Sequence, residues 1–232
     1  MFRYAVQTGR ALRDPSADLK EGLPKYTPKN FAAFTEPADL AAMLRAMDAF
    51  KGTFVVQCAL KLGPLLFVRP GELRKAKWAE FELDQGYWAF IVSKVKVPYI
   101  VPLAKQAVTV LRELHALTGG GEYVFTGRDP KKPMSEAAVN AALRRMGYDT
   151  KTEITGHGFR ATARTILHER LGQKPEVIEH QLSHAVPDNL GAAYNRTKFI
   201  DDRVRMMQVW ANYLDTLRTG GNVIAGKFGR VA

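Results

Sequence analysis

Residues Trp78 to Leu103 read WAEFELDQGYWAFIVSKVKVPYIVPL, and this stretch decides the fold. Elsewhere the apolar residues mostly recur every three or four positions. Here they alternate with polar residues or form short runs rich in aromatic and β-branched side chains, separated by turn residues, a pattern typical of short strands joined by tight connections. We therefore expect a small antiparallel sheet with strands at 78–83, 87–92 and 99–103 and turns at 84–86 and 93–97.

Helical patterns flank the expected sheet on both sides. In the segment that starts at 36–40, apolar residues recur at Leu40, Met43, Leu44 and Met47, which is the spacing of one buried helical face. The expected helices cover 1–12, start at 36–40, cover 53–62, begin near Pro70, and cover 106–117, 135–146, 160–171, 175–182 and 201–217. The fold class is therefore α+β, mostly helical with a small three-stranded antiparallel sheet.

The composition is that of a soluble globular protein that either binds polyanions or is merely basic. The 232 residues include 34 Lys and Arg against 23 Asp and Glu, a net charge of +11, and such an excess attracts nucleic acids. No run of eighteen apolar residues is present, so no membrane span is expected. Cys58 has no cysteine partner, and no Cys/His cluster has zinc spacing. We expect a cytoplasmic protein in which Cys58 is a small buried apolar side chain.

Side chains suited to phosphodiester chemistry occur in four short motifs. They are Arg69 in VRPGEL (68–73), His157 and Arg160 in TGHGFR (155–160), His184 in QLSH (181–184) and Tyr194 in AYNR (193–196). Arginine suits phosphate because its planar fork donates two parallel hydrogen bonds and stays charged. A phenol can form a covalent phosphotyrosine, and imidazoles can move protons. The set indicates phosphodiester cleavage that needs no metal.

The order Arg69, a lysine, His157-x-x-Arg160, His184 and Tyr194 resembles the active site of the tyrosine recombinases, the phage integrase family. The phrases FVRPGELR, TGHGFR, AAYNR and MMQVWANYL are most similar to prophage integrases of the satellite-phage type. The resemblance covers nearly the whole chain after about residue 30. It implies a mostly helical tyrosine-recombinase catalytic domain, and the serine before His184, where the family more often has Gly or Ala, is a mild departure.

The resemblance implies a role for each of these residues. Arg69 and Arg160 would clamp the non-bridging oxygens of the scissile phosphate, and His184 would donate a hydrogen bond to it. Tyr194 would be the nucleophile. His157 would be the base or proton shuttle near Tyr194, and the glycines on either side of it are expected to let a ligand approach the backbone closely.

The family also places a lysine between the second and third strands, as general acid for the 5′-hydroxyl leaving group. Lys94 and Lys96 both lie in that turn, and aligning VPYIVPL (97–103) with the family's pattern favours Lys94. The alternative for either is a solvated turn lysine. The residues expected to contact DNA are Arg69, Lys94, Lys96, Arg160 and His184.

Each candidate also has an ordinary structural interpretation. A lone arginine is usually a surface residue or a salt-bridge partner, and His157 could cap a helix or lie in the core. Tyr213 is the rival of Tyr194, but its spacing in the last helix is typical of a core residue. Glu72 either orients a catalytic group or pairs on a helix surface. The joint occurrence of the motifs favours the functional interpretation.

The resemblance also divides the chain. Residues 1–20 are expected to be the end of a truncated core-binding domain, 21–34 a linker, 35–219 the integrase catalytic domain and 220–232 a flexible tail. An arm-binding domain, which such integrases carry at the amino terminus, is not expected in this chain. The last helix is expected either to pack on its own domain or to dock into a neighbouring protomer.

The implied function is site-specific DNA recombination, for integration and excision, through a 3′-phosphotyrosyl intermediate and without metal or nucleotide cofactor. The implied partners are double-stranded DNA attachment sites, a homo-tetramer on DNA formed from free monomers, and accessory DNA-bending and excision factors. The implied location is the bacterial cytoplasm, at the nucleoid. A chromosome-dimer resolvase or a type IB topoisomerase would use the same chemistry, and a non-catalytic DNA-binding remnant is the alternative from another class.

Overall fold

The computed structural model describes residues 2–17, 31–92, 97–183 and 199–220. The chain forms two compact units, Met1–Asn30 and Phe31–Ala232. Within the smaller unit, α1 (Phe2–Gln7) is shorter than the helix expected over 1–12. It ends early because Gly9 adopts a left-handed φ of 70°, and the Gly9 N–H then bonds to the Val6 carbonyl.

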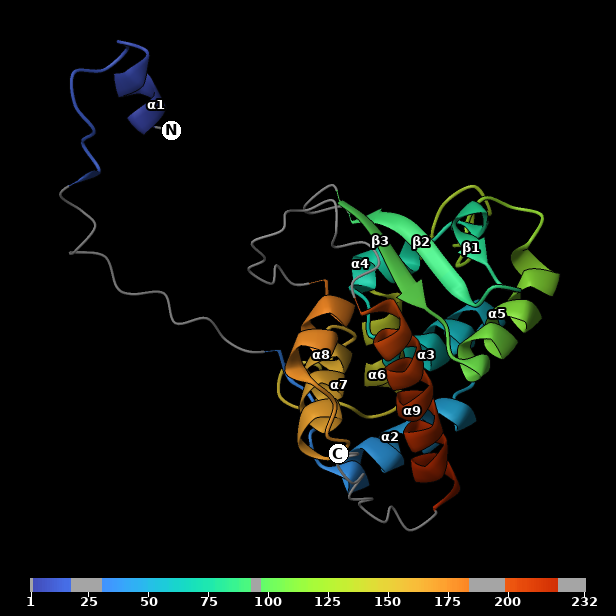
Figure 1. Cartoon of the computed structure of the whole chain (residues 1–232). Coiled ribbons are helices and arrows are strands. Elements are labelled where there is room, and N and C mark those ends of the chain that lie inside the picture. The colour runs from blue at the N-terminus through green and yellow to red at the C-terminus, as the bar shows by residue number, and fades with distance from the viewer. Residues whose placement is uncertain (1, 18–30, 93–96, 184–198, 221–232) are drawn as a thin grey trace. The chain divides into compact units, whose positions relative to one another are not determined.

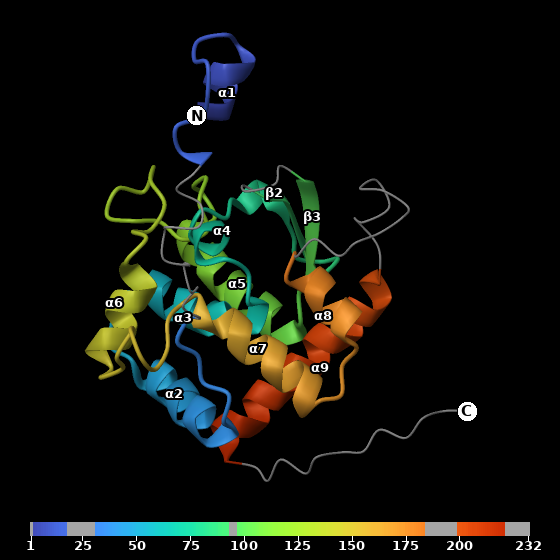
Figure 2. The same cartoon turned by 90° about the vertical axis from the view of Figure 1, so that its left-hand side faces the viewer.

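Helices make up most of the larger unit, as expected from the sequence (Figures 1 and 2). Their bounds agree with the expected ones to within a few residues. They are α2 (Pro37–Ala49), α3 (Phe54–Leu66), α4 (Pro70–Arg74), α5 (Lys105–Thr118), α6 (Ala138–Arg145), α7 (Gly158–Glu169), α8 (Pro175–Gln181) and α9 (Ile200–Thr219).

The sheet is three-stranded and antiparallel, as predicted. Strands β1 (Phe81–Glu82), β2 (Tyr87–Val92) and β3 (Val97–Pro102) are antiparallel in the order β1-β2-β3, with Trp88 opposite Val101 in the register. Together with the helices, this confirms the α+β fold class.

The first strand is much shorter than the expected segment 78–83. Residues Trp78–Glu80 form a 3₁₀ turn, since the Glu80 carboxylate accepts hydrogen bonds from the Lys77 N–H (3.1 Å) and from the Trp88 indole (3.0 Å). The Trp78 ring packs edge-on against His115 at 4.7 Å. The alternation that suggested a strand therefore comes mainly from a turn that is held by side chains.

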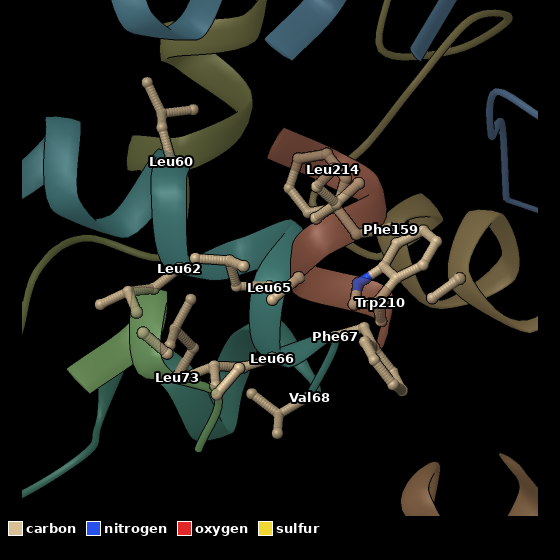
Figure 3. Close-up of a cluster of buried hydrophobic side chains, with 14 of the residues drawn as sticks. Leu60, Leu62, Leu65, Leu66, Phe67, Val68, Leu73, Phe159, Trp210 and Leu214 are labelled. Carbon is tan, nitrogen blue, oxygen red and sulfur yellow. The ribbon is translucent and has the colours of Figure 1, made fainter. Parts of the chain in front are cut away.

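Helix α3 lies at the centre of the larger unit. It packs against α2, α4, α5, α6, α7 and α9, and it is apolar on most of its surface, as a helix covered on all sides must be. Its side chains form a continuous cluster with Phe67, Phe159 and Trp210 (Figure 3). Cys58 belongs to this core at 2% exposure, which confirms its predicted burial. Burial raises the pKa of its thiol to about 11.

Helix α9 packs on its own chain. It contacts α2, α3, α5, α8 and β3, so the structure has the first of the two arrangements expected for the last helix. Trp210 is fully buried, and its indole N–H donates to the Pro64 carbonyl at 2.8 Å. Tyr213 is 6% exposed, as its core-like spacing predicted. No helix in the described part of the chain has the length and apolar character to cross a membrane.

Candidate functional site

The structure describes some of the predicted site residues and not others. Arg69, His157 and Arg160 are described, whereas Lys94, Lys96, His184 and Tyr194 lie outside the described residues. The described side chains are thus the two predicted phosphate-binding arginines, His157 and the residues around them.

Arg69 immediately precedes α4, and Glu72 holds it from inside the fold. The Arg69 backbone N–H donates to Glu72 Oε2 at 3.1 Å, and its guanidinium Nη1 donates to Glu72 Oε1 at 3.0 Å. The side chain of Glu72 is only 6% exposed, against 24% for that of Arg69. Of the two alternatives for Glu72, the structure thus favours orientation of Arg69 over a surface pair. A buried carboxylate that meets both groups restricts the direction of the guanidinium.

Arg160 lies in the first turn of α7 and is buried, with 6% exposure. Its Nη1 donates to the Phe67 carbonyl at 3.0 Å and its Nη2 to the Leu182 carbonyl at 2.7 Å. Burial, assisted by the positive charge of Arg69, lowers the pKa of Arg160 to about 10. The guanidinium therefore remains charged at neutral pH.

Phe67 directs its carbonyl at Arg160 from an unusual backbone conformation. It caps the end of α3 with φ 37° and ψ 35°, the left-handed region that bulky side chains rarely adopt. The residue is fully buried, and its ring meets Trp210 edge-on at 6.2 Å. The packing of the ring compensates for the strain and holds this end of α3 next to Arg69.

The end of α8 brings the two arginines together. Leu182 and Ser183 are adjacent, and their carbonyls accept from Arg160 Nη2 (2.7 Å) and Arg69 Nη2 (3.2 Å). The last carbonyls of a helix lack partners within the helix and carry partial negative charge, which suits cations. Ser183 leaves the helix in a left-handed conformation with φ 51°. Residues distant in the sequence thus share one helix end.

His157 occupies the N-cap position of α7, immediately before its first residue, but its side chain does not cap the helix. The Thr155 hydroxyl oxygen accepts from the Gly158 N–H at 2.9 Å, and the His157 side chain makes no capping bond. The imidazole lies 4.0 Å from the Phe31 ring, centroid to centroid, and is partly buried. Of the ordinary interpretations of His157, the position at the helix cap is correct, but capping by a side-chain hydrogen bond is not observed.

The glycines around His157 admit the chain's own atoms. A Cβ on Gly158 would stand 2.1 Å from the Ala32 carbonyl oxygen, and a Cβ on Gly156 would stand 3.2 Å from a Val139 methyl. The expectation that these glycines let a ligand approach is not met in the described contacts. Residues Phe31–Phe34, assigned to the linker from the sequence, lie within the larger unit, where Phe34 packs on the core.

Tyr99 and Arg203 also belong to this site, and sequence reasoning missed them. The Tyr99 hydroxyl donates to the carbonyls of His180 (3.0 Å) and Gln181, next to those that bind the arginines. Arg203 is 1% exposed, donates to Gln181 Oε1 at 2.9 Å and to the Ile100 carbonyl, and has its guanidinium 5.0 Å from the Tyr99 ring. Arg203 precedes Met207 and Trp210 at helical spacing, which is the signal that its side chain is buried.

The described part of the site is suited to binding an oxyanion. Two guanidiniums lie close enough for the charge of one to lower the pKa of the other, and the Glu72 carboxylate forms an ion pair with Arg69. In that same part of the chain, no group of three or more His, Cys, Asp or Glu side chains could hold a metal ion. Neighbouring guanidiniums are groups that can donate hydrogen bonds to a phosphate and stabilise its negative charge.

Comparisons with solved structures identify the fold as that of tyrosine recombinase catalytic domains. A lambda integrase dimer bound to a COC′ core site matches with a TM-score of 0.56 and 20% identity, over 84% of this chain and 55% of that one. The integrase from mycobacterium phage Brujita matches with a TM-score of 0.59 and 15% identity, over 93% of this chain and 72% of that one. At these identities the likeness concerns the fold alone.

The sequence comparisons show the family. The family model described as "Phage integrase family" matches residues 33–199, and this chain belongs to that family. It is 39% identical to the integrase of Enterobacteria phage P4, over 94% of this chain and 53% of that protein. It is 34% identical to the prophage integrase IntZ of Escherichia coli K12, over 95% of this chain and 54% of that protein. The likeness to the phage P4 protein supports the predicted satellite-phage type. The chain spans about half the length of these curated relatives.

Proposed function

We propose that this chain is the catalytic part of a site-specific DNA recombinase that cleaves and rejoins DNA for integration and excision. One observation carries the proposal: Arg69 and Arg160, far apart in the sequence, are held at one helix end by adjacent carbonyls. Such a pair fits the two non-bridging oxygens of one phosphate. The names of the two curated relatives and of the family support the same activity.

In the proposed first step, the phenolic oxygen of Tyr194 attacks the scissile phosphorus. A bond forms from Tyr194 to the 3′-phosphate, and the bond to the 5′-oxygen breaks. His157 takes up or passes on the phenolic proton, while His184 and the two arginines stabilise the charge that grows on the phosphate oxygens. The 3′-phosphotyrosyl bond keeps the energy of a phosphodiester, so a 5′-hydroxyl from another strand can reverse the step.

The leaving 5′-oxygen needs a proton, which we assign to Lys94 rather than Lys96. A substrate with sulfur at the bridging 5′ position tests this assignment, because a thiolate leaves without protonation. We expect Lys94→Ala to cleave ordinary DNA slowly and the sulfur substrate at the wild-type rate. Lys96→Ala, the matched control, should cleave both at nearly the wild-type rate. If the sulfur substrate rescues Lys96→Ala instead, the two assignments are exchanged.

The proposed partners are double-stranded attachment sites and further copies of this chain. Lambda integrase has been solved as a tetramer bound to a Holliday junction, which shows that a protein with this fold assembles in that way. We infer a tetramer on DNA formed from free monomers, with Arg69, Lys94, Lys96, Arg160 and His184 at the DNA, and with accessory DNA-bending and excision factors as further partners. The proposed location is the cytoplasm, at the nucleoid.

A suicide substrate tests the proposed reaction. DNA carrying a nick just beyond the cleavage position loses the short 5′-hydroxyl fragment, so a covalent adduct accumulates and is visible as a slower band on a denaturing gel. We expect an adduct with the wild-type chain, none with Tyr194→Phe, and DNA binding by both. Tyr213→Phe is the matched control, because Tyr213 is buried in the core.

Two results would contradict the proposal. If the wild-type chain binds DNA but forms no adduct, the chain is a non-catalytic DNA-binding remnant. If the adduct forms in Tyr194→Phe and disappears in Tyr213→Phe, the nucleophile has been misassigned. Binding to DNA alone does not distinguish the two functions, since both predict a steep loss of affinity with added salt.

A further inference from the structure

The carboxyl end of α8 is bound by side chains from three other parts of the chain. Four consecutive carbonyls, at residues 180–183, each accept a hydrogen bond from a side chain. Tyr99 binds those of His180 and Gln181, Arg160 binds that of Leu182, and Arg69 binds that of Ser183. Carbonyls at the end of a helix generally lack partners within the helix, although that of His180 also accepts the Ser183 N–H at 3.0 Å. The end of α8 is therefore the common support of both arginines.

Tyr99 reaches this support from β3 as a permanent hydrogen-bond donor. Burial raises the pKa of its phenol to about 12, although the positive charge of Arg203 acts in the opposite direction. The phenol is therefore protonated at neutral pH, and its single proton can be shared between the two carbonyls in a bifurcated hydrogen bond. A phenylalanine would fill the same space and donate nothing.

Arg203 connects Tyr99 to the same helix end by a second route. Its guanidinium lies 5.0 Å from the Tyr99 ring and donates to the Gln181 side-chain oxygen and to the Ile100 carbonyl beside Tyr99. Because Arg203 belongs to α9, the contact joins β3, α8 and α9. Neither residue belongs to the proposed reacting set.

We propose that Tyr99, backed by Arg203, is a positioning residue of the phosphate site. Its hydroxyl binds the carbonyls of residues 180 and 181. It thereby fixes the positions of the Leu182 and Ser183 carbonyls, which accept hydrogen bonds from Arg160 and Arg69. If the helix end moves, both guanidiniums move with it, and misplacing a reacting group by about 1 Å can lower a rate by roughly 10²-fold. The effect on the reaction rests on the proposed function, whereas the effect on α8 does not.

The test compares two substitutions that each remove one buried phenolic oxygen. Tyr99→Phe deletes the bonds to α8. Tyr213→Phe is the matched control, because the Tyr213 hydroxyl is buried and has no hydrogen-bond partner among the described residues. With the nicked substrate in single turnover, we expect Tyr99→Phe to lower the rate constant of adduct formation by about 10- to 100-fold. The final yield of adduct and the affinity for DNA should stay as in the wild type.

The yield separates positioning from misfolding. A variant that is merely less stable contains fewer active molecules, so its yield falls while the rate constant of the remaining molecules does not change. A normal rate constant in Tyr99→Phe, in a preparation where the wild type and Tyr213→Phe form adduct, would overturn the proposal. An equal slowing in Tyr213→Phe would also overturn it, because the removal of any buried phenolic hydroxyl would then slow the reaction, whether or not it binds α8.

Amide hydrogen exchange supplies a readout that does not need activity. We expect exchange at the end of α8, over residues 178–183, to be faster in Tyr99→Phe than in the wild type and unchanged in Tyr213→Phe. If the wild type forms no adduct, the proposed function fails, but exchange still decides whether Tyr99 holds the helix end. Unchanged exchange in Tyr99→Phe would refute the inference whatever the activity.

Discussion

Replacing Gly158 by alanine tests the contact between the start of α7 and the segment Phe31–Phe34. The new Cβ would stand 2.1 Å from the Ala32 carbonyl oxygen and 3.1 Å from an Ile154 methyl. Since ordinary contacts begin near 3.4 Å, the Ala32 carbonyl must move by more than 1 Å. It cannot move freely, because it accepts the Thr155 N–H at 3.3 Å and because Phe34 packs on the core.

The expected loss combines three contributions. Alanine in a helix is intrinsically favourable over glycine by about 0.5–1 kcal/mol. Against this, inserting a group into a filled space costs about 1–3 kcal/mol, and losing the Thr155 bond costs about 1 kcal/mol. We expect the free energy of unfolding of Gly158→Ala to fall by about 1–3 kcal/mol. For a unit of this size, each kcal/mol corresponds to roughly 2–4 °C in Tm.

Equilibrium unfolding in guanidinium chloride measures this loss. Gly71→Ala is the matched control, because Gly71 also lies in the first turn of a helix and a Cβ there meets nothing within 4 Å. We expect the midpoint of Gly71→Ala to equal or exceed that of the wild type. Equal midpoints for Gly158→Ala and Gly71→Ala would show that Ala32 is not held against α7, and would refute the reasoning.

Three further predictions concern the site and the core. Arg160→Lys keeps the charge but loses the fork that binds two carbonyls; we expect adduct formation to slow by about 10²–10³-fold with DNA binding retained, and wild-type rates would refute the phosphate clamp. Phe31→Ala removes the ring beside His157; because an aromatic pair contributes about 0.5–1.5 kcal/mol, the free energy of unfolding should fall by about that amount or less, and an unchanged value in guanidinium unfolding would contradict the contact. Cys58, with a pKa of about 11, should resist iodoacetamide at pH 8 until guanidinium unfolds the chain, and rapid alkylation of the native protein would contradict its burial.

Sequence patterns predicted the helices well because their apolar residues follow the period of the helix. The buried residues of α2 are the ones expected from the spacing that begins at Leu40, and α4 begins at Pro70, as expected. The prediction of a strand from Trp78 was wrong, because the alternating residues there form a 3₁₀ turn that the Glu80 side chain stabilises. The bond from Trp88 to Glu80 depends on how β2 folds back, which the local pattern does not contain.

Buried polar residues were harder to predict than the apolar core. Arg203 shares the helical spacing of Trp210, yet an arginine near a helix start is ordinarily assigned to the surface. It is buried because Gln181 and the Ile100 carbonyl accept its hydrogen bonds, and both lie in other elements. Tyr99 was assigned to a strand, but its bonds to the end of α8 depend on how the tertiary fold brings that strand residue to the helix.

The amino-acid sequence by itself determined the fold class, the family and the ordered set of candidate groups, because these depend on local spacing and on short motifs. Only the tertiary structure decided how Arg69 and Arg160 come together, which residues support them, and that Glu72 faces inward. The physical reason is that a guanidinium is oriented by carbonyls and carboxylates around it. Here the carbonyls at the end of α8 are supplied by helix packing, and no spacing along the chain encodes their positions.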